Sequence, residues 1–221
     1  NVFSTLTICK LAAKYGINSV LLISSDKAVR PTNVMGATKR LSELIFQDFA
    51  EKNLKTKFSM VRFGNVLGSS GSVVPLFNEQ ISKGGPLTIT NENVIRYFMT
   101  VEEAALLVIQ SNVISNSGDV LLLDMGKPVK IIDLAKNLVR LNGLKIRDKD
   151  NPDGDIEIKI IGLRSGEKLY EELLIESKSI STEHPLIFKA REKSIDTNLL
   201  QKTLEEMKAL IKKNNLKDLI K

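Results

Sequence analysis

The sequence has few of the residues that hold metal ions or form disulfides. Among its 221 residues one is a cysteine and one is a histidine, and tryptophan is absent. Cys9 has no second cysteine to pair with, and His184 has no cysteine near it with which it could form a metal-ligand cluster. These absences exclude an internal disulfide and favour a metal-free site in a reducing compartment, so we expect a cytoplasmic protein.

Long apolar runs are also absent. No run reaches the roughly 18 residues that cross a bilayer, and residues 1–15 contain no basic and apolar signal segment. With 43% hydrophobic and 26% charged residues, the composition is that of a globular protein. We therefore expect no membrane contact by this chain.

The formal net charge of +6 raises the question of an anionic partner. Much of the basic excess lies near the C-terminus, among apolar residues. We interpret this segment as a solvated helix face and predict no nucleic-acid partner, with a nucleic-acid or membrane patch as the alternative. Its lysines are Lys208, Lys212, Lys213, Lys217 and Lys221.

The spacing of apolar residues predicts alternating helices and strands. Residues 1–15 have near-helical spacing and end at Gly16, which suits a left-handed helix end. Residues 19–23 are typical of a buried strand, residues 35–53 of a helix and residues 58–62 of a second strand. This strand–helix–strand order predicts a parallel sheet with covering helices, so the expected fold class is α/β.

The alternation is interrupted after residue 63 by a loop rich in glycine and serine, and it resumes further along the chain. We expect a surface loop at residues 146–155. The other expected elements are helices at 73–83, from 101, at 129–141 and after 196–197, and strands at 87–90, 120–124 and 156–161.

Three polar residue types meet where the first strand ends. Ser24, Ser25, Asp26 and Lys27 follow that strand, and ligands of open α/β sheets bind beyond the carboxyl ends of strands. A hydroxyl, a carboxyl and an amine supply a hydrogen-bond donor, an acid and a base, which is the set that proton transfers around a sugar require. An ordinary polar exit from a strand is the alternative interpretation.

Further polar stretches follow along the chain. Met35 and Lys39 share one face at the start of a helix. The glycines of residues 62–72 are spaced G-x-x-x-G-x-x-G and not G-x-G-x-x-G, so we interpret this segment as a loop that cradles a substrate and not as a dinucleotide loop. Arg96 and Arg164 lie beside apolar segments, and the planar fork of arginine suits a diphosphate, with a surface ion pair as the alternative.

Taken in order, these stretches resemble the CapD-like polysaccharide-biosynthesis branch of the extended short-chain dehydrogenases/reductases, and within it the UDP-N-acetylglucosamine 4,6-dehydratases. The resemblance covers nearly the whole chain. The segments that carry it are 24–28 (SSDKA), 31–39 (PTNVMGATK), 62–68 (RFGNVLG), 71–75 (GSVVP) and 162–168 (GLRSGEK).

The resemblance implies a partial Rossmann-type parallel sheet with a smaller C-terminal α/β substrate lobe. Residues 1–64 would be the C-terminal part of the NAD(P)-binding domain, without its first strands. Residues 65–221 would be the substrate lobe, with about 91–125 returning to the Rossmann part. The resemblance also implies bound NAD or NADP, a UDP-sugar substrate and a homo-oligomer, and it leaves open a parent protein anchored at the cytoplasmic face of the bacterial inner membrane.

The reaction implied by the resemblance turns a nucleotide sugar into its 4-keto-6-deoxy form for surface polysaccharides. Oxidation at C4 acidifies the C5 proton, the C6 hydroxyl leaves as water, and a hydride returns to C6. In this scheme Asp26 would protonate the departing C6 hydroxyl and Lys27 would remove the C5 proton. Ser25 would hydrogen-bond the sugar near O4.

Other residues are expected to hold the cofactor and the substrate. Lys39 matches the active-site lysine of the superfamily and would bind the nicotinamide ribose. Ser24 and Phe63 are further expected cofactor contacts. The residues expected to bind the UDP-sugar are Asn65, Val73, Arg96, Arg164 and Glu167.

The sequence departs from the superfamily pattern in two ways. Met35 stands where the tyrosine of Tyr-x-x-x-Lys is usual, and a thioether can neither give nor take the C4 hydroxyl proton. Because the large dehydratases of this branch share the substitution, we keep Met35 in the catalytic group. We expect the C4 base to be Asp26, with a water activated by Lys39 as the alternative. No glycine motif for the cofactor phosphates precedes residue 19, so we interpret the chain as a fragment that is inactive by itself.

Two other functions stay open. A UDP-sugar 4-epimerase shares the fold and cofactor but needs no acid–base pair for the loss of water, so Asp26 and Lys27 favour the dehydratase. The second alternative is a truncated, non-catalytic chain that binds a nucleotide sugar or dimerises.

Overall fold

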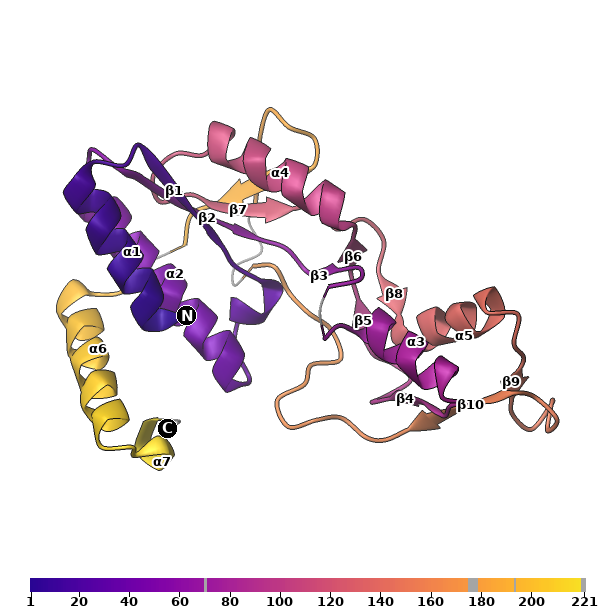
Figure 1. Ribbon diagram of the computed structural model, residues 1–221. Helices are drawn as coiled ribbons and strands as arrows, with labels where there is room; N and C mark the ends of the chain where they lie inside the picture. The colour runs from indigo at the N-terminus through magenta and orange to yellow at the C-terminus, as the bar shows by residue number, and fades with distance from the viewer. Residues whose placement is uncertain (70, 175–178, 193, 220–221) are drawn as a thin grey trace. The chain divides into compact units, whose positions relative to one another are not determined.

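The computed structural model describes residues 1–69, 71–174, 179–192 and 194–219 (Figure 1). By their contacts these residues form two compact units. The first unit is drawn from residues 1–62, 108–123 and 173–221, and the second from residues 63–107 and 124–172.

The first unit is built on a five-stranded sheet with the order β1-β2-β7-β12-β11. Strands β1, β2 and β7 are parallel, and β12 runs antiparallel to β7. The parallel strands confirm the expected α/β class. The strands are β1 (Ser19–Ile23), β2 (Lys57–Arg62), β7 (Val120–Leu123), β11 (Ile180–Ser181) and β12 (Ile187–Ala190).

Helices cover this sheet on both faces. Helices α1 and α2 lie over one face and the C-terminal half of α4 over the other (Figure 1). Helix α1 ends at Gly16, whose φ of 65° is the left-handed conformation that its sequence position predicts. The helices are α1 (Val2–Tyr15), the 3₁₀ helix η1 (Asp26–Ala28), α2 (Val34–Lys52), α4 (Val101–Ile114), α6 (Thr197–Lys212) and α7 (Leu216–Leu219).

The apolar core of the first unit lies between its sheet and helices α1, α2 and α6. Alternate residues of a strand face opposite sides, and in β2 Phe58 and Met60 join this core with Val120 of β7. Phe46 of α2 meets Phe58 edge-on, with ring centroids 5.6 Å apart. By the same alternation Arg62 lies on the same face of the sheet as Phe58 and Met60. A charged residue therefore ends a row of apolar ones.

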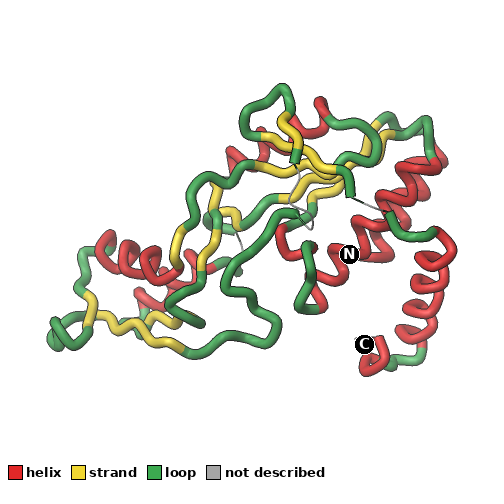
Figure 2. The backbone as a smooth tube through the Cα atoms, turned by 180° about the vertical axis from the view of Figure 1, so that it is seen from behind, coloured by secondary structure: helices red, strands yellow, loops and turns green. Residues whose placement is uncertain are grey.

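The second unit contains a three-stranded parallel sheet with the order β4-β10-β9. Figure 2 shows the strands of the chain in yellow from behind. Phe77 of α3 and Val139 of α5 pack with Ile156 of the sheet in a separate apolar core. Two short strand pairs, β3·β6 and β5·β8, complete the unit. Its strands are β3 (Asn65–Val66), β4 (Leu87–Ile89), β5 (Ile95–Arg96), β6 (Phe98–Met99), β8 (Val129–Lys130), β9 (Ile146–Arg147) and β10 (Ile156–Ile160), and its helices are α3 (Val73–Ser82) and α5 (Ile131–Leu141).

The division into units differs from the one expected from the sequence. Of the segment expected to return to the Rossmann part, residues 108–123 do so, whereas residues 91–107 stay in the second unit. Residues 173–221, which we expected in the substrate lobe, belong to the first unit. The physical reason is that β12 extends the sheet beside β7 and that Leu200 and Leu204 of α6 enter the core.

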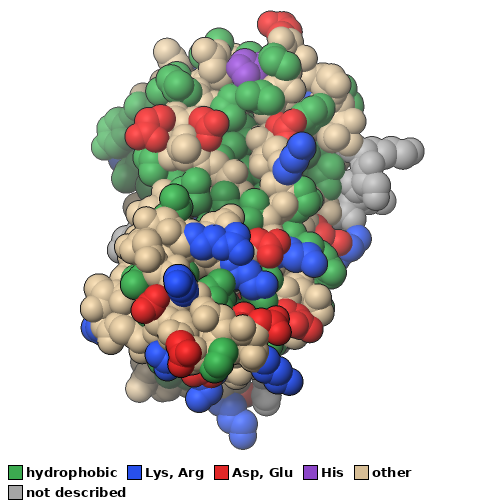
Figure 3. All heavy atoms as spheres, turned by 90° about the vertical axis from the view of Figure 1, so that its right-hand side faces the viewer, with side chains coloured by type: hydrophobic (Ala, Val, Ile, Leu, Met, Phe, Trp, Pro, Cys, Tyr) green, Lys and Arg blue, Asp and Glu red, His purple; other side chains and the backbone are tan. Residues whose placement is uncertain are grey.

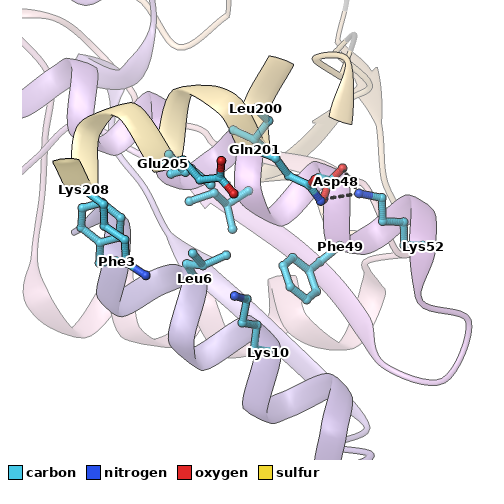
Figure 4. Close-up of a pocket in the computed structure, with 12 residues that line it drawn as sticks. Phe3, Leu6, Lys10, Asp48, Phe49, Lys52, Leu200, Gln201, Glu205 and Lys208 are labelled. Carbon is cyan, nitrogen blue, oxygen red and sulfur yellow. Dashed lines mark hydrogen bonds and ion pairs between the residues drawn. The ribbon is translucent and has the colours of Figure 1, made fainter. Parts of the chain in front are cut away.

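Helices α1, α2 and α6 border a cavity of about 460 Å³ (Figure 4). Apolar side chains such as Phe3, Leu6 and Phe49 line it together with charged ones such as Lys10 and Glu205. Among the described residues, those expected in catalysis are not part of its lining. The cavity is therefore distinct from the candidate site.

Charges of both signs are distributed over the surface. On the face drawn in Figure 3, basic side chains lie beside acidic ones. The C-terminal lysines at 208, 212, 213 and 217 are exposed, as a solvated helix face requires, and Lys221 lies outside the described residues. Within the described ranges, none of the helices has both the length and the apolar character needed to span a bilayer.

The aromatic packing around Phe58 gives a test of the core. Phe58 is fully buried, so Phe58→Ala should lower the free energy of unfolding by about 3–5 kcal/mol through lost burial and a residual cavity. Leu54 precedes the same strand and is 99% exposed, so Leu54→Ala should change it by less than about 0.5 kcal/mol. Urea denaturation of both variants checks this, and equal effects would contradict the described core.

Candidate active site

Three of the candidate catalytic residues, Ser25, Asp26 and Lys27, lie in a single turn at the end of β1, which we call the strand-end loop (residues 24–27). The backbone N–H of Ser24 donates to the carbonyl of Val61 at 2.8 Å, so pairing with β2 extends to the first residue of the loop. Ser25 then caps η1, because its Oγ accepts from the backbone N–H of Lys27 at 3.2 Å. The loop therefore begins at a fixed point beyond the carboxyl end of a parallel strand, where ligands of such sheets bind.

The carboxylate of Asp26 is the centre of this loop. Its Oδ1 accepts hydrogen bonds from Ser25 Oγ at 2.8 Å and from Lys27 Nζ at 2.9 Å. The Asp26 side chain is 5% exposed and that of Lys27 is 28% exposed. The structure thus brings the expected acid, base and hydroxyl into one hydrogen-bonded group whose lysine reaches solvent.

Helix α2 presents a polar stripe to the end of β1. Residues three or four positions apart lie on the same helix face, and Gly36, Lys39 and Glu43 have this spacing. Lys39 Nζ donates to the carbonyl of Ile23 at 3.1 Å. Glu43 Oε1 accepts from Ser24 Oγ at 2.6 Å. One helix face therefore holds the last residue of the strand and the first residue of the loop.

Gly36 lets this helix approach the loop. The side chain of Asn33 caps α2 by accepting from the N–H of Gly36 at 2.9 Å. A Cβ on Gly36 would lie only 2.3 Å from the carbonyl oxygen of Lys27. Backbone packed this closely needs a residue without a side chain.

Three further residues were expected to act in catalysis or cofactor binding. Met35 is in the first turn of α2 and is 47% exposed. Ser24 is buried and its hydroxyl proton is given to Glu43, so toward a ligand its oxygen can only accept. Phe63 is half-buried and directly follows β2. Their expected roles in catalysis or cofactor binding stay predictions.

A buried ionic group that the sequence analysis missed lies behind the loop, which we call the Arg62 network (Arg40, Glu43, Arg62 and Glu192). All five N–H donors of the Arg62 guanidinium have an acceptor. Two go to Glu43 at 2.7 Å each, two to Glu192 at 2.7 and 2.8 Å, and one to the carbonyl of Leu173 at 3.1 Å. Removing one partner of such a buried pair generally destabilises a protein by about 3–5 kcal/mol, because the other charge is left uncompensated.

The charges of this network shift one another's titration. Burial alone lowers the pKa of Arg62, but the hydrogen bonds and charges of Glu43 and Glu192 outweigh burial and raise it above its ordinary value. Burial raises the pKa of Glu192, but Arg62 and Arg40 outweigh that effect and lower it. Arg62 and Glu192 are thus held in their charged forms.

The sequence contains a signal for only part of this network. Glu43 lies four residues after Lys39, so helical spacing already places it on the face that meets the loop. Glu192 is 130 positions from Arg62 and lies in no periodic segment that would indicate its partner. The ion pair between Glu192 and Arg62 is therefore evident only from the folded structure.

In the second unit, Arg96 holds the segment that contains Lys168 and Leu169. Its Nη1 donates to the carbonyls of Ile95 at 2.8 Å and Leu169 at 3.1 Å, and its Nη2 donates to that of Lys168 at 2.8 Å. Glu167 lies 3.6 Å away as an ion partner. With its side chain only 9% exposed, Arg96 supports this segment in the present arrangement, and its expected contact with UDP stays a prediction.

The remaining substrate candidates also lie in the second unit. Glu167 orders a turn by accepting from the backbone N–H of Arg164 at 3.1 Å and from Thr90 Oγ1 at 2.8 Å. Arg164 is exposed. Asn65 pairs in β3 through its N–H to the carbonyl of Tyr97, and Val73 packs against the unit's apolar core. The structure thus brings Arg96, Arg164 and Glu167 together, while Asn65 and Val73 lie on other elements.

Metal ligands were not expected from the sequence. Among residues 1–69, 71–174, 179–192 and 194–219, no group of three or more His, Cys, Asp and Glu side chains is placed to hold a metal ion. The polar groups at the strand end are a carboxylate, hydroxyls and amines, whose chemistry is proton transfer and hydrogen bonding.

Comparison with known proteins places the chain in a family. A family model described as polysaccharide biosynthesis protein matches residues 1–192. The capsular polysaccharide biosynthesis protein CapD of Staphylococcus aureus is 53% identical over 79% of this chain and 28% of its own length. A UDP-glucose 4-epimerase of Rickettsia rickettsii is 35% identical over 79% of this chain and 48% of its own length. A UDP-N-acetylglucosamine 4,6-dehydratase (inverting) of Campylobacter jejuni is 31% identical over 81% of this chain and 50% of its own length.

A solved structure has the same fold. The X-ray structure of Pen from Bacillus thuringiensis superposes with a TM-score of 0.75 at 32% identity, covering 88% of this chain and 59% of that one. The chain spans from 28% to 50% of the length of the three curated relatives. Activity, substrate and partners of the whole protein are therefore matters for proposal.

The close contact between Gly36 and Lys27 can be tested by exchanging glycine and alanine at two neighbouring positions of α2. Alanine normally stabilises a helix relative to glycine by about 1 kcal/mol. At position 36 we expect the reverse, so Gly36→Ala should destabilise the protein by about 1–3 kcal/mol because its Cβ overlaps the Lys27 carbonyl. The adjacent Ala37 is exposed, and Ala37→Gly should show the ordinary loss of about 1 kcal/mol. A stabilised Gly36→Ala variant, measured by denaturation, would contradict the close approach.

Proposed function

This chain belongs to the polysaccharide biosynthesis protein family, in the CapD-like branch of the extended short-chain dehydrogenases/reductases, and we propose that its parent protein catalyses NAD(P)-dependent 4,6-dehydration of a UDP-N-acetylhexosamine. Its relatives include a dehydratase and an epimerase of nucleotide sugars. The observation that carries the proposal is the Asp26–Lys27 pair, which joins a carboxyl and an amine at 2.9 Å. Loss of water needs both an acid and a base, and this pair contains both.

The contact between Asp26 and Lys27 suits the elimination step. An amine removes a proton only in its neutral form, and a carboxyl donates one only when protonated. Asp26 enters this step carrying the proton that it took from the C4 hydroxyl, and Lys27, whose side chain is 28% exposed, enters it as the neutral amine after giving its own proton to solvent. Lys27 then takes the C5 proton while Asp26 gives its proton to the departing C6 hydroxyl, so the C6–O bond breaks, water leaves and a C5–C6 double bond forms.

The residues at the end of β1 fit a nicotinamide cofactor. When bound, NAD(P) supplies hydride acceptance at C4 and hydride return to C6. An ammonium has three N–H donors, and one of those of Lys39 holds the Ile23 carbonyl at 3.1 Å. Among the described residues, Ile23 is the acceptor that Lys39 is seen to use, which leaves donors for the hydroxyls of a ribose. Phe63 is proposed as a further cofactor contact, and the expected contact of Ser24 is at most a minor one, because its buried hydroxyl gives its proton to Glu43.

The C4 hydroxyl proton needs its own acceptor, because Met35 has none to offer. We assign this role to Asp26, whose carboxylate accepts hydrogen bonds and is already oriented by Ser25 at 2.8 Å. Having taken the C4 proton, Asp26 is in the protonated form that the later loss of water requires. A water activated by Lys39 is the alternative.

The substrate's UDP group is assigned to residues of the second unit. Arg164 is exposed, and a guanidinium fork matches the paired oxygens of a diphosphate. Glu167 orders the turn that carries Arg164. Asn65, Val73 and Arg96 complete the proposed substrate group.

A UDP-sugar 4-epimerase is the second candidate, because one relative with that name is 35% identical. Epimerisation moves a hydride at C4 and leaves C5 and C6 intact, so it has no use for an acid–base pair that acts there. The Asp26–Lys27 contact therefore favours dehydration. A nucleotide-sugar-binding or dimerising chain without catalysis would need neither residue.

The acid–base assignment gives a direct test with the full-length protein. Incubation with NAD and UDP-N-acetylglucosamine should yield a product that has lost one water, measured by mass spectrometry, with solvent deuterium exchanged at C5. Asp26→Asn and Lys27→Met should each lower kcat by about 10²–10⁴-fold. Lys55→Met, which removes an exposed lysine before β2, should leave kcat unchanged. A product of unaltered mass with an inverted C4 centre would show an epimerase instead.

Restoring the usual tyrosine tests position 35. If this position faces the reacting C4 hydroxyl, Met35→Tyr introduces a group that gives and takes protons, and the pH dependence of kcat should gain an additional ionisation. The measurement is a pH–rate profile of the variant beside that of the unaltered protein. Superimposable profiles would remove position 35 from any part in proton transfer.

A further inference from the structure

The carboxylate of Glu43 connects the Arg62 network to the strand-end loop. Its Oε1 accepts from Ser24 Oγ at 2.6 Å and from Arg62 Nε at 2.7 Å. Its Oε2 accepts from Arg62 Nη2 at 2.7 Å and from Arg40 Nη1 at 2.9 Å. With two acceptor sites on each oxygen, these four bonds use the full capacity of a side chain that has no exposed surface.

Such a carboxylate has very little freedom to move. Arg62 is itself bound on all sides, and Arg40 bonds to Glu43 and Glu192 together, at 2.9 and 2.7 Å. Tilting Glu43 would break charge-assisted bonds in a place that water does not reach, which is far less favourable than in solvent. The oxygen that receives the Ser24 hydroxyl is consequently a fixed point.

From Glu43 Oε1 a continuous series of hydrogen bonds and peptide bonds leads through Ser24 to the proposed acid and base. Ser24 is followed by Ser25, whose hydroxyl donates to Asp26, and Asp26 pairs with Lys27. The Ser24 backbone is held to Val61 on the other side. The position of Asp26 relative to a bound sugar thus depends on where Ser24 is held.

We propose that Glu43 is a positioning residue of this enzyme: through the Ser24 hydroxyl it fixes the strand-end loop and so aligns Asp26 and Lys27 with the sugar. Glu192 and Arg62 act behind it by fixing Glu43. The inference rests on the proposed function for the reaction it aids, and it adds residues that contact neither sugar nor cofactor. Small displacements of catalytic groups reduce rates strongly even when binding is intact.

The decisive variant is Ser24→Ala. It removes the bond to the loop but leaves Glu43 with its partners Arg62 and Arg40, so the buried charges stay compensated. In the full-length protein we expect kcat to fall by about tenfold or more, with KM for the UDP-sugar and the dissociation constant for NAD changed by less than about twofold. Ser24→Thr, which keeps a hydroxyl, should recover part of the lost kcat.

The matched control is Ser59→Ala in β2. Like Ser24, Ser59 is buried and bonded to a side chain, in this case Ser115 Oγ at 3.0 Å, but it lies outside the strand-end loop. Its replacement should leave kcat unchanged. If Ser24→Ala and Ser59→Ala lower kcat equally, the effect of Ser24 is one of general packing and the proposal fails.

Glu43→Gln completes a double-mutant cycle. If Glu43 acts through Ser24, its replacement should lower kcat in the unaltered protein but not further in Ser24→Ala, because the link is already absent. Additive losses would overturn the proposal. If Glu43→Gln does not fold, Ser24→Ala decides alone: an unchanged kcat refutes the proposal, as does a raised dissociation constant for NAD at unchanged kcat, which would make Ser24 a cofactor contact.

Failure of the proposed function gives a different result. In that case the unaltered full-length protein would form no dehydrated sugar. The variants would then be compared by the rate at which the UDP-sugar reduces bound NAD, a step that an epimerase shares. The same loss in Ser24→Ala relative to Ser59→Ala is expected there, and its absence refutes the positioning role.

Discussion

The first unit depends on the buried ion pairs that the guanidinium of Arg62 forms with Glu43 and Glu192. Arg62 ends the row of Phe58 and Met60 on the core side of β2, so its charge enters a region where an unpaired ion would be very costly. Compensation comes from Glu43 on α2 and from Glu192 beyond β12. Neither carboxylate is on β2. The charge of Arg62 is therefore compensated only when α2 and the segment after β12 pack against this strand.

The site grows out of the same arrangement. Helix α2 carries Gly36, Lys39 and Glu43 along one face, and these meet Lys27, Ile23 and Ser24 in turn. Glycine permits contact, lysine holds a carbonyl, and glutamate holds a hydroxyl. The stripe thus combines three chemically different contacts, and together they fix the strand's last residue and the loop that follows it.

The sequence predicts helix α2, strand β1 and the position of the loop after it, because each of these depends on residues that are close together in the sequence. The spacing of apolar residues predicted α2, and a short apolar run predicted β1. The polar residues that follow this run lie at the carboxyl end of the strand, as expected. The C-terminal segment could not be placed in the same way. Strand β12 is four residues long and pairs antiparallel with a strand more than sixty positions earlier, and Glu192 contributes one charge without any periodic pattern. Both were missed because their partners are defined only by the folded sheet.

Arg62, Arg96 and Arg164 have different environments, and these environments indicate different roles. Arg62 is saturated by two carboxylates and a carbonyl, and Arg96 gives three of its bonds to backbone carbonyls. A guanidinium used in this way supports structure, because rebinding to a ligand would leave carbonyls or carboxylates unsatisfied. Arg164 is exposed, and its turn is ordered by Glu167 through the backbone, not through the guanidinium. Of the three, Arg164 is therefore the one whose charge can reach a diphosphate without losing bonds within the protein, whereas Arg96 joins it only by giving up carbonyl bonds.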